Sequence, residues 1–304
     1  MRTLSLEIGR RSGLVYAIAL MLPLVFLFGH TLSARAVDTG TVVPISPTLC
    51  DEMRAHNVMR PESPLSCARL SLVSFPYVGF DGKIHGDGRI VVMDATAEYV
   101  LQIFTKLHEI RFPIAHARLM NHYEGNDSAS TADNNTSSFN ARKSVGGKSL
   151  SMHAYGLAID LNPVQNPYVT GSGSRLRVMP PPAAEYANRS IRRPGMAESV
   201  IDVFADQGFV EWGGYWHNPI DYQHFQVKRS MSERLAALSA AQARAVFKQY
   251  VERYRACRKN SAPDSSRSKC IMTEGARVRE DVFVSENGRG TRAAPDTSRI
   301  SSFW

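Results

Sequence analysis

The chain has 304 residues, 43% of them hydrophobic and 21% charged, and a formal net charge of +8 at pH 7. This composition is that of an ordinary globular protein, and the chain is long enough to bury a substantial core. Its basic residues form no patch interleaved with aromatic side chains, so the sequence gives no sign of nucleic-acid binding.

The first 36 residues have the pattern of an export signal. Three arginines precede an uncharged apolar run over residues 13–29, and Ala34-Arg35-Ala36 supplies small residues at the usual cleavage positions. We therefore expect a signal peptide over residues 1–36. An uncleaved signal anchor is the alternative, because the apolar run approaches the length of a membrane span. Both alternatives export the rest of the chain, whose net charge is about +5 once four arginines and one glutamate are removed.

All four cysteines follow this segment, at positions 50, 67, 257 and 270. In an oxidising compartment an even number of cysteines predicts disulfide bonds. Of the three possible connectivities, the favoured one joins neighbours in sequence, Cys50 to Cys67 and Cys257 to Cys270. A zinc site made of cysteines is the competing interpretation, but no two cysteines have the close spacing that such sites use.

The N-terminal part of the exported chain is expected to contain little regular structure. Residues 37–84 are predicted to form a wrap tied by the first cysteine pair, and the chain is irregular to about residue 75. Residues 89–93 are rich in β-branched side chains and predict the first strand. Asp94 is then a candidate N-cap for a helix whose apolar residues recur at helical spacing and which Pro113 ends.

The middle of the chain alternates between polar segments and short regular elements. The polar segment 125–148 predicts a long loop that leads into an alternating strand over residues 157–161. Residues 163–195 form an irregular excursion, and a helix over residues 197–207 is expected to end at Gly208.

The next elements are a turn, a strand and a helix. Residues 212–216 predict a tight aromatic turn whose two tryptophans are expected to be packing residues rather than sugar-stacking ones, and residues 224–227 predict a short strand. Ser230 and Glu233 have the spacing of a capping box for a helix that runs to about Arg255.

Strands and helices are mixed without the regularity of βαβ units, and the sequence contains no internal repeat. This mixture predicts an α+β fold, with one domain over residues 85–256 built on a small antiparallel sheet flanked by helices. Residues 257–304 are polar and without periodicity, which predicts a C-terminal tail.

The first motif that contains candidate catalytic or metal-binding residues is Ser151-x-His153-x-x-Gly156-x-Ala158-x-Asp160. His153 and Asp160 are seven residues apart, which is not the spacing of two ligands on one helix. Gly156 allows the backbone to turn from the loop into the strand, where Ala158 and Asp160 share one face. That face is expected to line a cleft, with room left by the small Ala158 for a metal ion or substrate.

The second motif is Asp221-x-x-His224-Phe225. On its strand, His224 and Gln226 are expected to face the cleft. Together with His153 and Asp160, His224 would complete three ligands with an open fourth position, which is the pattern of a catalytic zinc site. Asp221 precedes His224 by three residues, so the segment must turn for both side chains to reach one metal ion. Asp221 is the candidate base that takes a proton from the attacking water and passes it to the leaving amine.

Further candidates lie near these motifs. Arg142 could hold a substrate carboxylate or stabilise an oxyanion, and Ser151 could orient the substrate by a hydrogen bond. On spacing alone, His217 and Glu211 remain alternatives for a ligand and for the base. Each candidate taken singly also has a structural explanation as a hydrogen-bonded histidine, a turn residue or a solvated charge.

The two motifs together resemble those of the D-alanyl-D-alanine carboxypeptidase and L-alanyl-D-glutamate endopeptidase family, the VanY-like zinc peptidases. The first motif matches the family signature from Ser151 to Asp160. The second motif, preceded by Trp212-Gly-Gly-x-Trp216, resembles the branch that contains phage L-alanyl-D-glutamate endolysins. The similarity covers about residues 85–230, with both halves in the expected order.

The resemblance implies a zinc peptidase domain that acts on the stem peptides of peptidoglycan. It implies that His153, Asp160 and His224 bind Zn²⁺ and that Asp221 stands at the position of the acid/base carboxylate. Arg142 aligns with an arginine that precedes the first motif in the family, and Ser151 matches the motif serine. The resemblance does not explain the excursion over residues 163–195, which could shape the substrate cleft. It therefore leaves open whether the enzyme is of the carboxypeptidase or the endopeptidase type.

The leading hypothesis is an exported zinc metallopeptidase of the bacterial periplasm or cell envelope, which cleaves peptidoglycan peptides by zinc-activated water. The alternative is a zinc-bound, non-hydrolytic module that either binds the cell wall or has a regulatory role. A third hypothesis is a zinc hydrolase of the same fold with another substrate, since fold does not fix function. No nucleic-acid partner is expected, and no stable membrane insertion unless the N-terminal segment stays uncleaved.

Overall fold

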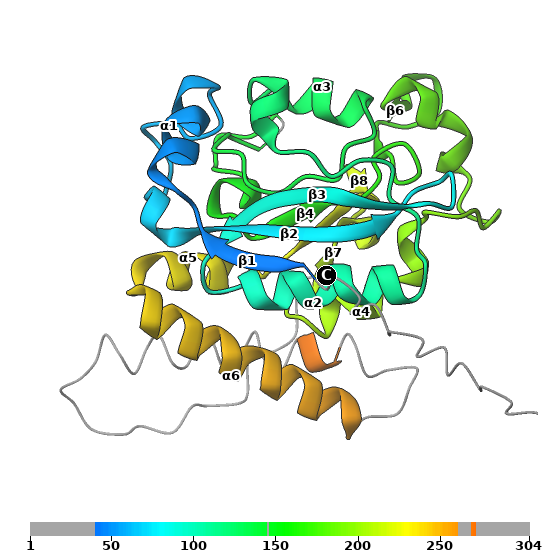
Figure 1. Ribbon diagram of the computed structural model, residues 1–304. Helices are drawn as coiled ribbons and strands as arrows, with labels where there is room; N and C mark the ends of the chain where they lie inside the picture. The colour runs from blue at the N-terminus through cyan, green and yellow to red at the C-terminus, as the bar shows by residue number, and fades with distance from the viewer. Residues whose placement is uncertain (1–39, 145, 261–268, 272–304) are drawn as a thin grey trace, which may run out of the picture. The chain divides into compact units, whose positions relative to one another are not determined.

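The computed structural model describes residues 40–144, 146–260 and 269–271. The predicted signal peptide over residues 1–36 and most of the predicted tail lie outside these residues. The described part contains helices and three antiparallel sheets of three strands each (Figure 1). The α+β fold class predicted from the sequence is confirmed.

The first sheet has the strand order β1-β2-β3 and is formed by β1 (Thr41–Pro44), β2 (Leu70–Val78) and β3 (Ile84–Met93). Helix α2 (Ala97–Glu109) packs against it (Figure 1). The rings of Phe75 in β2 and Phe104 in α2 stack, and both are buried. The apolar periodicity that predicted α2 is therefore the stripe that covers the sheet.

Two details before and at the start of α2 differ from the predictions. Asp94 is not the N-cap, because the helix begins after Thr96. The carboxylate of Asp94 instead accepts hydrogen bonds from the guanidinium of Arg69.

The prediction that regular structure begins only at residue 89 is wrong. β1 and β2 precede it, as does helix α1 (Pro47–Ala55), which Ser46 caps by accepting a hydrogen bond from the Leu49 backbone.

The second sheet has the order β4-β9-β7 and joins β4 (Ala158–Asp160), β9 (His224–Gln226) and β7 (Glu211–Trp212). Ile159 lies opposite Phe225, and Phe225 stacks on Phe204 of helix α4 (Ile201–Ala205). Both predicted strands are confirmed, and their apolar residues anchor the sheet in the core. The predicted helix over residues 197–207 is a 3-10 turn followed by α4, and Gly208 follows with a positive φ of 91°.

The excursion over residues 163–195 is more regular than predicted. It contributes β5 (Tyr168–Thr170) and β6 (Arg177–Met179) to the third sheet, which has the order β6-β5-β8 with β8 (Ile220–Asp221). The predicted loop before β4 contains the short helix α3 (Asp127–Ala132). The described part of the chain also contains seven 3-10 turns: Cys67–Arg69, Met120–Tyr123, Met152–Tyr155, Gly173–Arg175, Pro181–Ala187, Ala197–Ser199 and Gly213–Tyr215.

The helix predicted from Ser230 to about Arg255 is two helices, α5 (Arg229–Ala237) and α6 (Ala240–Lys259). The capping box that begins α6 is formed by Ser239 and Gln242, whereas Ser230 lies inside α5. The predicted disulfides Cys50–Cys67 and Cys257–Cys270 are both present. Within the ranges that the structure describes, no helix has the length and apolar character needed to cross a membrane.

Candidate metal centre

Three potential metal ligands converge from three separate elements. His153 lies in the 3-10 turn Met152–Tyr155, Asp160 ends β4, and His224 begins β9. Each offers a ligand atom within 4.8 Å of the other two, and all three residues are at most 7% exposed. The structure thus brings together the three side chains that the two motifs singled out as a ligand set.

Local backbone geometry explains how the first two ligands meet. Ser151 caps the 3-10 turn by accepting a hydrogen bond from the backbone N–H of His153 at 3.3 Å. Gly156 ends the turn with a φ of +62°, and a Cβ at this position would lie 2.6 Å from the backbone nitrogen of Met93. Glycine is therefore required both for the left-handed conformation and for the close approach to β3. The chain then enters β4 and reaches Asp160.

The hydrogen bond of His153 defines which of its nitrogens is available. Nδ1 lies 2.6 Å from the carbonyl oxygen of Ser138, so Nδ1 carries the proton and donates it. Nε2 lies 3.1 Å from Oδ2 of Asp160 and has no hydrogen-bond partner among the described residues, although it is buried. A buried imidazole nitrogen that is turned toward a carboxylate is suited to hold a metal ion.

His224 is oriented by a chain of side-chain contacts. Its Nε2 lies 2.8 Å from Oε1 of Gln226, whose amide nitrogen donates to Oε2 of Glu211 at 2.5 Å. Because that amide nitrogen is held by Glu211, the amide oxygen faces His224 and Nε2 of His224 is the donor. Nδ1, which lies 3.0 Å from Oδ1 of Asp160, is the atom left to face a metal ion.

The charges in this cluster reinforce one another. Burial alone would raise the pKa of Asp160, but the neighbouring imidazoles of His153 and His224 hold it well below its ordinary value. Burial alone would lower the pKa of His224, but the hydrogen bond to Asp160 and its negative charge raise it to about 9. In the absence of a metal ion, a proton on His224 therefore balances Asp160, and a bound cation would take the place of that proton.

Asp221 lies at the end of β8, opposite Tyr168 of β5. Residues 222–223 form a turn between β8 and β9, as predicted for a segment that must bring Asp221 and His224 together. Oδ1 of Asp221 is buried and lacks a hydrogen-bond partner in the described part of the chain. Burial, with the nearby charge of Asp160, raises the pKa of Asp221 to about 7. Asp221 can therefore exchange a proton near neutral pH.

A pocket of about 290 Å³ opens beside these groups. Its lining includes His153, His224 and Asp221 together with the predicted substrate residues Arg142 and Ser151. The guanidinium of Arg142 is held by Asp127 of α3, with Nε and Nη2 at 2.9 and 2.8 Å from Oδ1. All six residues predicted for the site thus either line this pocket or, in the case of Asp160, lie directly behind it.

The alternatives left open by the sequence fall outside the cluster. His217 is exposed, and neither it nor Glu211 belongs to the ligand group or lines the pocket. Trp212 is buried, as predicted for a packing residue, and its indole N–H donates to the carbonyl of Tyr222. For Trp216 the prediction is wrong. It is 37% exposed, lines the pocket, and its ring centroid lies 5.4 Å from that of His224.

Sequence reasoning missed the residues that support the site. Strand alternation predicts that Gln226 faces the cleft, but its contact with Glu211 depends on the pairing of β9 with β7. Ser138 and Asp127 lie in a long polar segment without periodicity, and nothing in their spacing indicates contact with His153 or Arg142.

Comparison with known protein families gives a match. A family model described as D-alanyl-D-alanine carboxypeptidase matches residues 145–227, which include His153, Asp160, Asp221 and His224. No curated protein and no solved structure matches the chain. The family that the two motifs resemble is thereby confirmed. The segment that builds this candidate metal centre is therefore similar to the peptidases of the D-alanyl-D-alanine carboxypeptidase family.

Proposed function

We propose that this protein is a zinc peptidase that removes the terminal D-alanine from peptidoglycan stem peptides. One observation carries the proposal. The free Nε2 of His153, Asp160 and Nδ1 of His224 face one another, and the buried carboxylate of Asp221 lines the same pocket. A ligand set and a proton acceptor thus meet at one pocket.

Zinc is the metal that best fits these donors. Two imidazoles and one carboxylate with a further open position are the protein ligands of many catalytic zinc sites. When bound, zinc supplies a Lewis acid that polarises the scissile carbonyl and makes water a stronger nucleophile near neutral pH. His153, Asp160 and His224 would hold it through the atoms that already face one another.

The residues of the chain supply proton transfer and substrate orientation. Asp221 takes the proton from the attacking water and returns it to the leaving amine, and its pKa of about 7 suits both steps. Arg142, oriented by Asp127, binds the terminal carboxylate of the substrate. Ser151 offers a hydroxyl at the pocket wall for a hydrogen bond to the peptide. A carboxylate clamp beside the ligands favours the carboxypeptidase type over the endopeptidase type.

Export to the periplasm or cell envelope is part of the proposal. It is supported by the arginine-rich start and apolar run within residues 1–36 and by the disulfides Cys50–Cys67 and Cys257–Cys270. Disulfides persist in such oxidising compartments.

Mass spectrometry of a defined stem pentapeptide, incubated with the purified zinc-loaded protein, tests the function. We expect zinc-dependent loss of one D-alanine, and no product with the Asp221→Ala variant. Cleavage between L-alanine and D-glutamate would instead identify an endopeptidase. Binding of the peptide without any zinc-dependent product would overturn the proposal in favour of a non-hydrolytic module.

A further inference from the structure

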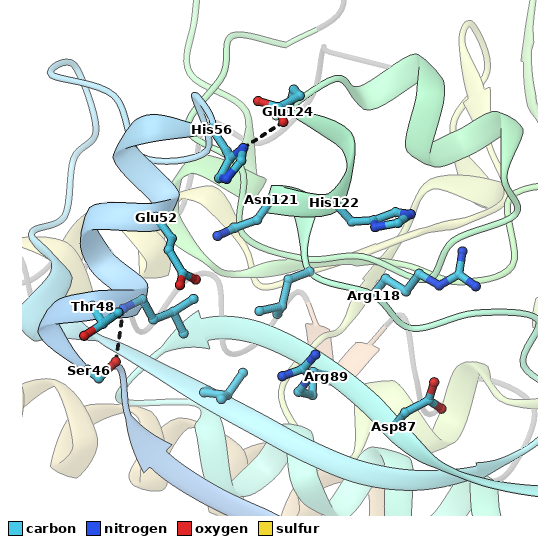
Figure 2. A pocket seen from close by; sticks show the side chains of 13 residues that line it. Ser46, Thr48, Glu52, His56, Asp87, Arg89, Arg118, Asn121, His122 and Glu124 are labelled. Atoms are coloured by element: carbon cyan, nitrogen blue, oxygen red, sulfur yellow. Dashed lines mark hydrogen bonds and ion pairs between the residues drawn. The ribbon is translucent and has the colours of Figure 1, made fainter.

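A second and larger pocket, of about 850 Å³, lies apart from the candidate metal centre and shares no lining residue with its pocket. Figure 2 shows it between helix α1, strand β3 and the segment that contains Asn121. Its volume is within the range of pockets that hold small ligands and is sufficient for a short peptide.

Two opposite charges face this pocket from different elements. Glu52 extends from α1 and Arg89 extends from β3 into the same space (Figure 2). In the described part of the chain, neither side chain has an ion-pair or hydrogen-bond partner. Each is therefore available to a ligand, Glu52 to a cationic group and Arg89 to an anionic one.

The other acidic residues and arginines at the pocket lie close to polar side chains. Arg118 pairs with Asp133 at 2.9 Å, and Glu124 pairs with His56 at 2.7 Å. Asp87 lies near the hydroxyl of Tyr77, and burial together with this carboxylate raises the pKa of Tyr77 to about 12. Among the acidic residues and arginines of the lining, Glu52 and Arg89 are thus the two without a polar partner in the described part of the chain, and a ligand with both an ammonium and a carboxylate group would complement them.

Asn121 adds a neutral donor. Its Nδ2 is buried and lacks a hydrogen-bond partner among the residues that the structure describes. Figure 2 shows this amide nitrogen directed toward the α1 side of the pocket. A buried donor that stays unpaired is costly, and a ligand carbonyl or carboxylate at this position would satisfy it.

We infer that this pocket binds a short zwitterionic peptide, with an ammonium group at Glu52, a carboxylate at Arg89 and a peptide or carboxylate oxygen at Asn121. The inference deepens and rests on the proposed function, because the proposed substrate is a polymer that displays many peptides of this kind. The pocket would hold one stem peptide while another occupies the metal centre, and so it would favour polymeric over small soluble substrates.

Calorimetric titration with L-alanyl-γ-D-glutamyl-L-lysine tests the inference. This peptide has ammonium and carboxylate groups but no terminal D-alanine to be removed. We expect the wild-type protein and the His153→Ala variant to bind it equally. The double variant Glu52→Gln/Arg89→Gln should bind it at least about tenfold more weakly, since two charge-assisted contacts are lost. The same peptide with both of its amines acetylated has no ammonium group left for Glu52, so it should bind the wild type more weakly than the unmodified peptide does.

The matched control is Lys248→Gln/Glu252→Gln, which removes one cation and one anion from the exposed face of α6, outside both pockets. It should bind like the wild type, and circular dichroism should show all variants folded. Unchanged affinity in Glu52→Gln/Arg89→Gln would overturn the inference, as would loss of binding in His153→Ala. Failure of the proposed function is distinguishable, because it would abolish hydrolysis of the pentapeptide and leave this binding intact.

Discussion

Asp160 and His224 lie directly opposite each other in the antiparallel pairing of β4 and β9, with Oδ1 of Asp160 3.0 Å from Nδ1 of His224. The register of two three-residue strands therefore sets the distance between two candidate ligands that are far apart in sequence. A shift of one residue would turn His224 to the opposite face of the sheet. Phe225 opposes that shift, because it is fully buried against Phe204 on the other face.

The ligand assignment predicts that His153→Ala loses stoichiometric zinc, because Nε2 of His153 is one of the three protein donors in the cluster. Zinc content after gel filtration, measured by elemental mass spectrometry, checks this. His217→Ala is the matched control, since this exposed histidine lies outside the cluster and should leave the zinc content unchanged. A His153→Ala protein that keeps one zinc ion per chain would contradict the assignment.

Gln226→Leu is expected to weaken zinc binding by about 10- to 100-fold, the usual effect of removing a hydrogen bond that orients a ligand. The reason is that Gln226 holds the Nε2 proton of His224 and is itself held by Glu211. Competition with a fluorescent chelator measures the affinity. Glu211→Leu should have the same direction of effect, whereas Glu211→Gln, which keeps an accepting oxygen, should be milder. If all three variants bound zinc as tightly as the wild type, the contacts from Glu211 through Gln226 would not be what positions His224.

Much of the site could be predicted because its geometry is local to each motif. Gly156 follows from the turn into β4, and the alternation along β4 and β9 predicts that Asp160 and His224 share a surface. The support of the site could not be predicted in the same way. Asp127 and Arg142 are joined by the tertiary position of α3, which no periodicity in that polar segment indicates.

The wrong predictions about the fold also arise where the local sequence pattern is weak or ambiguous. β1 is only four residues long and pairs at the edge of its sheet, so it has almost no buried pattern to detect. Ser230 and Ser239 are each followed at the third position by Glu or Gln, and both therefore have the spacing of a capping box. Only Ser239 begins a helix, because Leu238 before it adopts an extended conformation that separates α5 from α6.

Asp221→Asn is predicted to lower kcat by about 10²- to 10⁴-fold, the typical contribution of a general base, while zinc stays bound. The asparagine is nearly isosteric but cannot accept the proton of the attacking water. Steady-state hydrolysis of the stem pentapeptide, with zinc content measured in parallel, checks both parts. Wild-type activity in Asp221→Asn would remove Asp221 from the mechanism, and loss of zinc would show that it acts as a ligand.

Asp127→Asn is expected to raise KM several-fold and to change kcat little. Asp127 holds the guanidinium of Arg142 through Nε and Nη2, so its loss frees the side chain that is proposed to bind the substrate carboxylate. Arg142→Lys should raise KM further, because an ammonium group cannot reproduce the two-pronged contact. Steady-state kinetics on the pentapeptide and on its C-terminal amide separate the effects. If Arg142 binds the terminal carboxylate, the amide should be a poor substrate for the wild type, and Arg142→Lys should change its turnover little.

The stability of the metal-free protein should fall as the pH rises from about 6 to above 9. Asp221 has an ordinary pKa of 3.8 that is raised to about 7, and His224 has an ordinary pKa of 6.5 that is raised to about 9. A raised pKa in the folded state adds stability that is complete below the ordinary value and lost as the pH passes the raised one. The lowered pKa of Asp160 acts in the opposite direction, and its contribution is lost in acid.

Urea unfolding at pH 6, 7.5 and 9, in the presence of a chelator, measures this dependence. Asp221→Asn cannot titrate at this position, so the loss between pH 6 and 7.5 should be smaller than in the wild type. Zinc should reverse the trend, because protons compete with the metal for His224 and the apparent affinity rises with pH up to about 9. A metal-free protein that grows more stable from pH 6 to 9 would contradict the charge arrangement described for this centre.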